Sequence, residues 1–148
     1  MCGIVGYLNL NKQPIEERDN HLPRMCESIT HRGPDEEGWK VIGPAAIGMT
    51  RLSIIDVSGG QQPIANEDNT IWIVFNGEIY NFQELQTLVQ ERGHKLRTKS
   101  DTETIVHLYE EFGVDCLKYL EGMFAFAIWD SKKERLFIAR DRMGEKPL

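Results

Sequence analysis

The strongest constraint on the fold is a group of short segments that are apolar at nearly every position. The segments IWIVF (71–75), MFAFAIWD (123–130) and RLFIARD (135–141) hardly alternate between polar and apolar side chains. A strand with one solvated face alternates with a period of two, whereas a continuously apolar strand is covered on both faces. Together with several helical patterns, these segments predict an α+β fold in which helices pack outside antiparallel sheets.

The other elements are predicted from periodicity and from signals at their ends. Strands are expected at 2–9, 39–43 and 45–50, and helices at 15–30, 81–92, 101–112 and 114–120. Asn81 and Ser100 each stand three residues before a glutamate, which is the spacing of a helix capping box. The tetrapeptide SKKE (131–134) joins two strand patterns and therefore predicts a hairpin.

Composition and charge exclude several classes of protein. The 148 residues fit one domain and carry 17 Lys and Arg against 23 Asp and Glu, a net charge of −6. We therefore expect neither nucleic-acid nor membrane binding. The three cysteines form no CxxC pair and the four histidines share no metal-ligand spacing, so no disulfide framework and no metal site are expected. Free cysteines and the absence of signal-peptide features predict a cytoplasmic protein.

Cys2 stands directly after the initiator methionine. Removal of Met1 would leave one residue that carries both a thiol and a free α-amine. An α-amine has an ordinary pKa of about 7.7–8.0, so it is a suitable base near neutral pH, and an N-terminal residue can be nucleophile and base together. The alternative is an ordinary cysteine in a buried N-terminal strand, and Cys2 alone does not separate the two.

Seven motifs occur in order along the whole chain. They are MCGIVG (1–6), HRGPDEEG (31–38), RLSIID (51–56), NGEIYN (76–81), SDTE (100–103), GMFAFAIWD (122–130) and RDRMGEKPL (140–148). Their order and spacing resemble the class II glutamine amidotransferases, which are N-terminal-nucleophile hydrolases. HRGPD, RLSIID, GMFAFAIWD and GEKPL look most like the asparagine synthetase branch. The resemblance implies a four-layer α/β/β/α sandwich of antiparallel sheets flanked by helices, and a glutaminase domain over residues 1–148 that releases ammonia from glutamine.

The resemblance also implies roles for individual residues. Cys2 would attack the glutamine amide and form a thioester, with its freed α-amine moving the protons. Asn76 and Gly77 would stabilise the oxyanion, Arg51 would bind the substrate carboxylate and Asp101 the substrate ammonium. The remaining substrate-binding residues implied are Leu52, Ser53, Ile54, Ile55 and Glu78.

Four of these positions have simpler interpretations when the resemblance is set aside. Arg51 would then be a member of a surface ion pair, and Asp101 a charge at a helix start. The dipeptide NG (76–77) is typical of a hairpin turn, although a capped helix follows it instead of a matching strand.

Relatives of this kind continue into a second domain that uses ATP and Mg²⁺ to make asparagine from aspartate. We therefore expect this chain to be a glutaminase domain truncated at its C-terminus, with no cofactor of its own. The expected partners are glutamine and the synthetase domain of the parent chain, and an uncovered sheet edge would favour aggregation or a homodimer. Two alternatives stay open: a glutaminase domain serving a different ammonia acceptor, and a non-catalytic fragment that keeps the fold.

Overall fold

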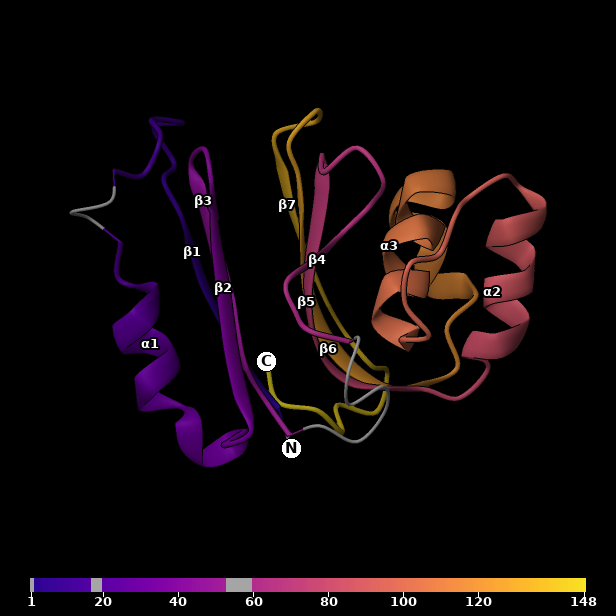
Figure 1. Cartoon of the computed structure of the whole chain (residues 1–148), viewed down its shortest axis with the longest axis horizontal. Coiled ribbons are helices and arrows are strands. Elements are labelled where there is room, and N and C mark those ends of the chain that lie inside the picture. Colours follow the sequence, from indigo (N-terminus) through magenta and orange to yellow (C-terminus); the bar gives the residue numbers. More distant parts are fainter. Residues whose placement is uncertain (1, 17–19, 53–59) are drawn as a thin grey trace.

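The computed structural model describes residues 2–16, 20–52 and 60–148, and arranges them in four layers (Figure 1). The elements are β1 (Gly3–Leu8), α1 (Leu22–Ser28), η2 (Thr30–Arg32), β2 (Glu36–Ile42), β3 (Ala45–Arg51), β4 (Ile64–Ala65), β5 (Ile71–Ile79), α2 (Phe82–Glu91), α3 (Asp101–Phe112), η3 (Gly113–Lys118), β6 (Gly122–Asp130) and β7 (Arg135–Arg140). Helix α1 covers one sheet and helices α2 and α3 cover the other, so the expected α/β/β/α sandwich is confirmed.

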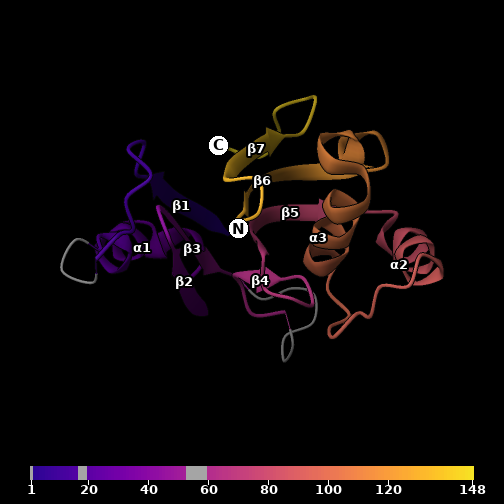
Figure 2. The same cartoon turned by 90° about the horizontal axis from the view of Figure 1, so that it is seen from above.

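Both sheets are antiparallel throughout the described residues. The first has the order β1-β3-β2 and the second the order β4-β5-β6-β7 (Figure 2). Strand β3 is buried along its full length because α1 packs on one of its faces and the second sheet faces the other. A Cβ at Gly48 would lie 3.1 Å from Cys26 Sγ, so this glycine lets α1 approach β3 closely. The hairpin predicted from SKKE is confirmed as β6 and β7.

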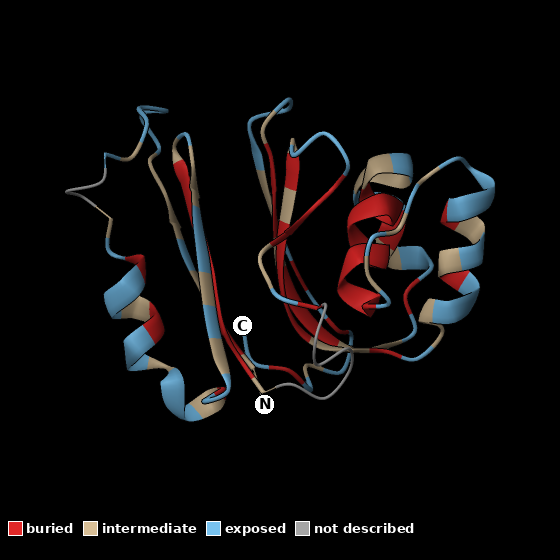
Figure 3. Cartoon of the chain, viewed as in Figure 1, coloured by how far each residue is buried: buried red, intermediate tan, exposed pale blue. Residues whose placement is uncertain are grey.

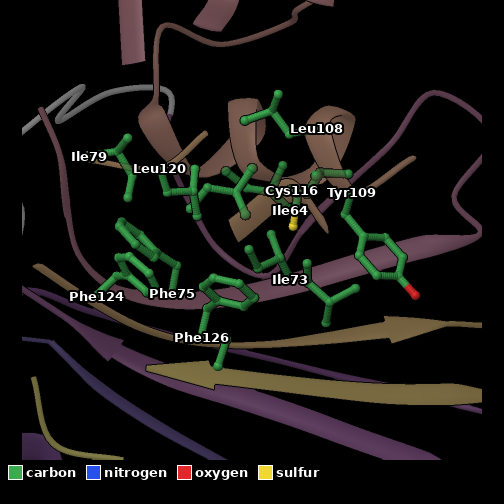
Figure 4. Close-up of a cluster of buried hydrophobic side chains, with 14 of the residues drawn as sticks. Ile64, Ile73, Phe75, Ile79, Leu108, Tyr109, Cys116, Leu120, Phe124 and Phe126 are labelled. Atoms are coloured by element: carbon green, nitrogen blue, oxygen red, sulfur yellow. The ribbon is translucent and has the colours of Figure 1, made fainter. Parts of the chain in front are cut away.

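The main hydrophobic core lies between the second sheet and the helices α2 and α3. Figure 4 shows its aromatic and aliphatic side chains, among them Phe75, Tyr109 and Phe126. Figure 3 shows that α3 and the strands beneath it are largely buried, whereas α2 has only two buried residues. A smaller cluster formed by Ile47, Met49 and Val74 joins the two sheets face to face. Strands β5 and β6 therefore have the cover on both faces that their sequence predicts. The prediction is wrong for β7, which lies at the edge of the sheet and leaves Ile138 50% exposed.

The structure corrects two predicted boundaries. Helix α1 begins at Leu22 instead of residue 15, with Pro23 in its first turn, where a missing backbone N–H is tolerated. Strand β5 continues through Asn76, Gly77 and Glu78, which pair with β6. The NG dipeptide is thus part of a strand and not of a turn.

The two predicted capping boxes also differ from the structure. Asn81 makes no cap, because its side chain bonds Tyr119 O and Glu121 N of the segment before β6. Ser100 does cap α3, accepting a hydrogen bond from Thr102 N at 3.1 Å. Glu103 does not complete the box and instead accepts backbone N–H bonds from the loop at 97–98. The short helix expected at 114–120 is the 3₁₀ helix η3, which covers Gly113–Lys118.

The cap at Ser100 leads to a stability prediction. We expect Ser100→Ala to lower the free energy of unfolding by about 1 kcal/mol, since one N–H of the first turn of α3 loses its acceptor. Urea denaturation measures the change. Ser28→Ala is the matched control, because Ser28 is exposed and bonds only Met25 O within its own helix, so its effect should stay within about 0.5 kcal/mol. Equal losses in the two variants would contradict the cap assignment.

Candidate functional site

A polar pocket of about 90 Å³ lies where β1 begins and β3 ends, between the edges of the two sheets. Its lining residues come from seven separate stretches of the chain: Cys2, Arg51, Leu52, Gly60, Gln62, Phe75, Asn76, Gly77, Glu78, Ser100, Asp101, Thr102, Met123 and Lys146. Every described residue assigned to catalysis or substrate binding from the sequence is in this set. Ser53, Ile54 and Ile55 lie outside the described residues.

A second cavity, of about 290 Å³, lies between the two sheets and is lined mainly by aliphatic side chains such as Ile4 and Ile138. Asn76 borders both cavities. An aliphatic lining suits an uncharged ligand, whereas the smaller pocket combines a thiol, a guanidinium and two carboxylates. The smaller pocket is therefore the candidate site.

Cys2 is half-buried at the start of β1, and its backbone is fixed from the neighbouring loop. The Arg32 guanidinium donates a hydrogen bond from Nε to Cys2 O at 3.1 Å, and Cys2 Sγ lies 3.7 Å from Leu52 O. Arg32 belongs to the HRGPD motif, for which the sequence indicated no contact with Cys2. This bond gives the motif a specific role in holding Cys2 at the pocket.

The same motif supports the end of β3. Pro34 forms an isolated bridge with Arg51, and Asp35 N donates a hydrogen bond to Arg51 O at 3.1 Å. A Cβ at Gly33 would lie 2.5 Å from Arg51 N, so only glycine allows the loop to approach the strand this closely. The loop thus fixes Arg51 and Cys2, on adjacent strands, relative to each other.

Arg51 is buried, with 5% of its surface exposed, so it is not the surface ion pair that its type alone would suggest. Its Nη1 donates to Glu36 Oε2 at 2.9 Å. Glu36 is on β2, next to Arg51 in the antiparallel register. The ion pair orients a guanidinium on the pocket wall, where its planar fork suits a carboxylate ligand.

Asn76 and Gly77 lie in the second half of β5. Asn76 is buried, and an amide side chain can donate hydrogen bonds without carrying charge. A Cβ at Gly77 would lie 2.2 Å from Met123 O and 2.7 Å from Phe124 Cα. Glycine is therefore required here for packing against β6, in addition to any close approach of a ligand to the backbone.

Asp101 is the first residue of α3 and is buried beside the end of β5. Its Oδ2 accepts a hydrogen bond from Ile79 N at 3.1 Å. Burial raises the pKa of Asp101 and the nearby charge of Glu78 raises it further, while the N–H groups of Ile79 and Thr102 oppose the shift. Asp101 joins α3 to β5 and, with Glu78, makes one end of the pocket acidic.

Several lining residues have no role predicted from the sequence. Gln62 Oε1 accepts a hydrogen bond from Phe75 N at 2.6 Å, and Gln62 Nε2 donates to Thr102 Oγ1 at 3.3 Å, so this side chain ties β5 to the start of α3. Lys146 is buried, and its backbone N–H donates to Asp141 Oδ2 at 3.0 Å. The GEKPL motif contained this lysine, but nothing local in the sequence indicated that it reaches the pocket.

The chain is similar to known proteins along its whole length. Residues 1–148 match a family model described as a glutamine amidotransferase domain. "Asparagine synthetase [glutamine-hydrolyzing] 2" of Bacillus subtilis (strain 168) is 44% identical, with 100% of this chain and 20% of that protein covered. "Asparagine synthetase [glutamine-hydrolyzing] 1" of Arabidopsis thaliana is 41% identical, with 97% and 24% covered. The chain thus spans a quarter or less of the length of these curated relatives.

One solved structure shows the same architecture. Glutamine phosphoribosylpyrophosphate amidotransferase from B. subtilis, complexed with ADP and GMP, superposes with a TM-score of 0.54 at 28% identity. The match covers 69% of this chain and 24% of that chain. No described helix of the present chain is long and apolar enough to cross a membrane.

The environments of the three thiols lead to a reactivity prediction. We expect iodoacetamide to modify only Cys2 in the native protein, because the thiolate is the reactive form and the other two thiols are fully buried. Burial raises the pKa of Cys26, and it raises the pKa of Cys116 to about 12.

Intact-mass measurement and peptide mapping test this selectivity. Native Cys2→Ala should stay unmodified, and all three thiols of the wild-type chain should react after unfolding in guanidinium. Rapid modification of native Cys116 would contradict the prediction.

Proposed function

The chain belongs to the glutamine amidotransferase family, and from this membership we propose that its polar pocket hydrolyses the side-chain amide of glutamine to glutamate and ammonia. The observation that carries the proposal is the common lining of one pocket by Cys2, Arg51, Asn76, Gly77 and Asp101. These residues come from four strands or helices that are far apart in the sequence. Together they offer a nucleophile, donors for an oxyanion, and opposite charges for the two ends of an amino acid.

In the proposed reaction, Cys2 Sγ attacks the Cδ atom of the glutamine side chain. The carbon–nitrogen bond of the tetrahedral intermediate then breaks, ammonia leaves with the proton it has received, and a glutamyl thioester remains. Water attacks the thioester carbonyl, glutamate is released and the thiol is restored. With Met1 removed, the α-amine of Cys2 is the base that takes and returns these protons.

Asn76 and Gly77 are the proposed donors to the negative oxygen of the tetrahedral intermediate. Donors held by a β-strand need little reorganisation when charge develops, and this is the condition for strong electrostatic stabilisation. Strand β5 holds both residues through its pairing with β6. Loss of one such donor typically lowers the rate about 100- to 1,000-fold.

The charges at the pocket are suited to a zwitterionic substrate. Arg51 is the proposed partner of the α-carboxylate, and Asp101 with Glu78 the proposed partner of the α-ammonium. A bound ammonium would stabilise the ionised form of Asp101 and so oppose the effect of burial on its pKa. Leu52 and the neighbouring segment 53–55 are proposed to contribute backbone contacts to the substrate.

In the complete protein, the ammonia would serve the ATP-dependent synthesis of asparagine from aspartate. The names of the curated relatives support aspartate as the ammonia acceptor. This chain covers only 20% and 24% of the length of two of them, so their remaining length is sufficient for a synthetase domain, which would bind the ATP and Mg²⁺. The amide hydrolysis itself uses only side chains and backbone groups of this domain. A different ammonia acceptor would require a different second domain, and the chemistry at Cys2 would be unchanged.

The central test is glutamate release from glutamine by wild type and by Cys2→Ala. We expect Cys2→Ala to have no activity above background, because the variant lacks the nucleophile. Intact mass must be measured on the same samples, and only chains without Met1 should be active. Equal activity in Cys2→Ala, or full activity in chains that retain Met1, would contradict the mechanism.

A second test concerns the carboxylate partner. We expect Arg51→Lys to raise the KM for glutamine at least about tenfold with little change in kcat, since a lysine cannot bind a carboxylate through two parallel hydrogen bonds. Arg24→Lys, on the exposed face of α1, is the matched control and should leave both constants unchanged. A fall in kcat at constant KM would instead place Arg51 in transition-state stabilisation.

A further inference from the structure

A second group of ionisable side chains lies in the outer helical layer, away from the polar pocket. Glu67 is in the loop between β4 and β5, His94 follows α2, and His107 and Glu110 are one turn apart on α3. One nitrogen or oxygen atom from each of the four lies within 4.8 Å of the other three. Sequence spacing did not indicate a metal site here, because the four residues come from three segments that only the fold brings together.

Four distances between histidine nitrogens and carboxylate oxygens in this group are close to those between neighbouring ligands of one ion. Nδ1 of His94 lies 3.5 Å from Glu67 Oε1 and 3.6 Å from Glu110 Oε2. Nδ1 of His107 lies 3.4 Å from Glu67 Oε2 and 3.6 Å from Glu110 Oε2. These separations exceed the roughly 2.7–3.2 Å of an N–H···O hydrogen bond. They match the ~3.3–3.6 Å between neighbouring ligands of a tetrahedral ion with bonds of about 2.0–2.2 Å.

His107 is the most deeply buried histidine of this group. It is fully buried, and neither of its ring nitrogens has a hydrogen-bond partner among the residues that the structure describes; the same holds for Glu110 Oε2. A buried imidazole and carboxylate that make no hydrogen bonds there lose their hydration, and the carboxylates at 3.4–3.7 Å from the ring are too far away to replace it with hydrogen bonds. A cation between them would accept the lone pairs of His107 Nδ1 and Glu110 Oε2 together.

A second set of carboxylates faces the outer nitrogens of both imidazoles. Glu111 Oε1 lies 3.1 Å from His94 Nε2, and Glu103 Oε1 lies 3.7 Å from His107 Nε2. Backbone N–H groups of residues 97 and 98 bond the Glu103 carboxylate at 2.9 and 2.6 Å. A carboxylate that faces Nε2 of a histidine keeps the proton on Nε2 and leaves Nδ1 available to bind a metal ion.

We propose that Glu67, His94, His107 and Glu110 bind one divalent cation of the Zn²⁺ class. Two imidazoles and two carboxylates suit Zn²⁺, whereas Mg²⁺ and Ca²⁺ prefer shells made of oxygen alone. Four protein ligands make a closed, structural type of site. The ion fastens the loops that carry Glu67 and His94 onto α3, whose first residue, Asp101, lines the polar pocket. The proposal does not depend on the reaction at Cys2.

Isothermal titration with Zn²⁺ tests the proposal on the purified chain after treatment with EDTA. We expect wild type to bind one equivalent, and Glu67→Gln and His107→Gln to bind at least about tenfold more weakly. His21→Gln is the matched control, because His21 is exposed and packs on Tyr7 far from α3 in the fold, and it should bind as wild type does. The midpoint of thermal unfolding should rise with Zn²⁺ in wild type and His21→Gln but not in Glu67→Gln.

Cys2 is the competing ligand for Zn²⁺, so two measurements distinguish it. Cys2→Ala should retain the site, and Co²⁺ in place of Zn²⁺ should give the spectrum of nitrogen and oxygen ligands without thiolate charge-transfer bands. The Glu67 side chain is 39% exposed, so Glu67→Gln keeps the test valid should His107→Gln fail to fold. The proposal is overturned by no saturable Zn²⁺ binding in wild type, by unchanged binding in Glu67→Gln, or by loss of binding in Cys2→Ala.

Discussion

The register of β5 against β6 is the constraint on which both the core and the polar pocket depend. The two strands pair without interruption from Ile71↔Asp130 to Ile79↔Gly122. Along β5, Ile73 and Phe75 point into the core beneath α2 and α3, whereas Val74 points toward the first sheet and Asn76 into the pocket. A slip of one residue would exchange these faces, burying Asn76 among aromatic rings. The clash that any side chain at Gly77 would make with Met123 and Phe124 restricts the sequence at this point of the ladder.

The pocket is built by charges that are fixed before a ligand arrives. Glu36 holds the guanidinium of Arg51 on one wall, and Asp101 is held on the other by Ile79 N. Asp101 also stands in the first turn of α3, where the helix dipole favours a negative charge. Burial disfavours the ionised form of Asp101, and a cationic group of a ligand would stabilise that form. The pocket lining therefore carries both positive and negative groups, as binding of a free amino acid requires.

Local sequence signals predicted the layers and most elements, because periodicity and end signals depend on residues close in the chain. The hairpin β6–β7, the limits of α3 and its cap at Ser100 are of this kind. Asn81 failed as a cap because its side chain is engaged by residues 119 and 121, some forty positions away.

The same distinction between local signals and long-range contacts applies to the residues of the site. Its motif residues were predicted from the resemblance, while the contacts made by Arg32 and Gln62, and the proximity of His94 to His107, depend on segments that meet only in the folded chain. Strand β5 was predicted to end too early for a related reason. Considered locally, an NG dipeptide favours a turn, whereas the pairing of Gly77 with Phe124 on β6 makes it part of the strand.

The hydrogen bond from Arg32 to Cys2 has a consequence for how the start of the chain is held. Arg32 bonds the carbonyl of Cys2, on the side toward Gly3, and leaves the amino nitrogen out of the contact. The pairing of Gly3 with Thr50 fixes the next residue in the same way. Among the described residues, Cys2 is thus held through its carbonyl group and its thiol. Cleavage of the peptide bond between Met1 and Cys2 would turn the amide nitrogen of Cys2 into an amine and leave both of these contacts available.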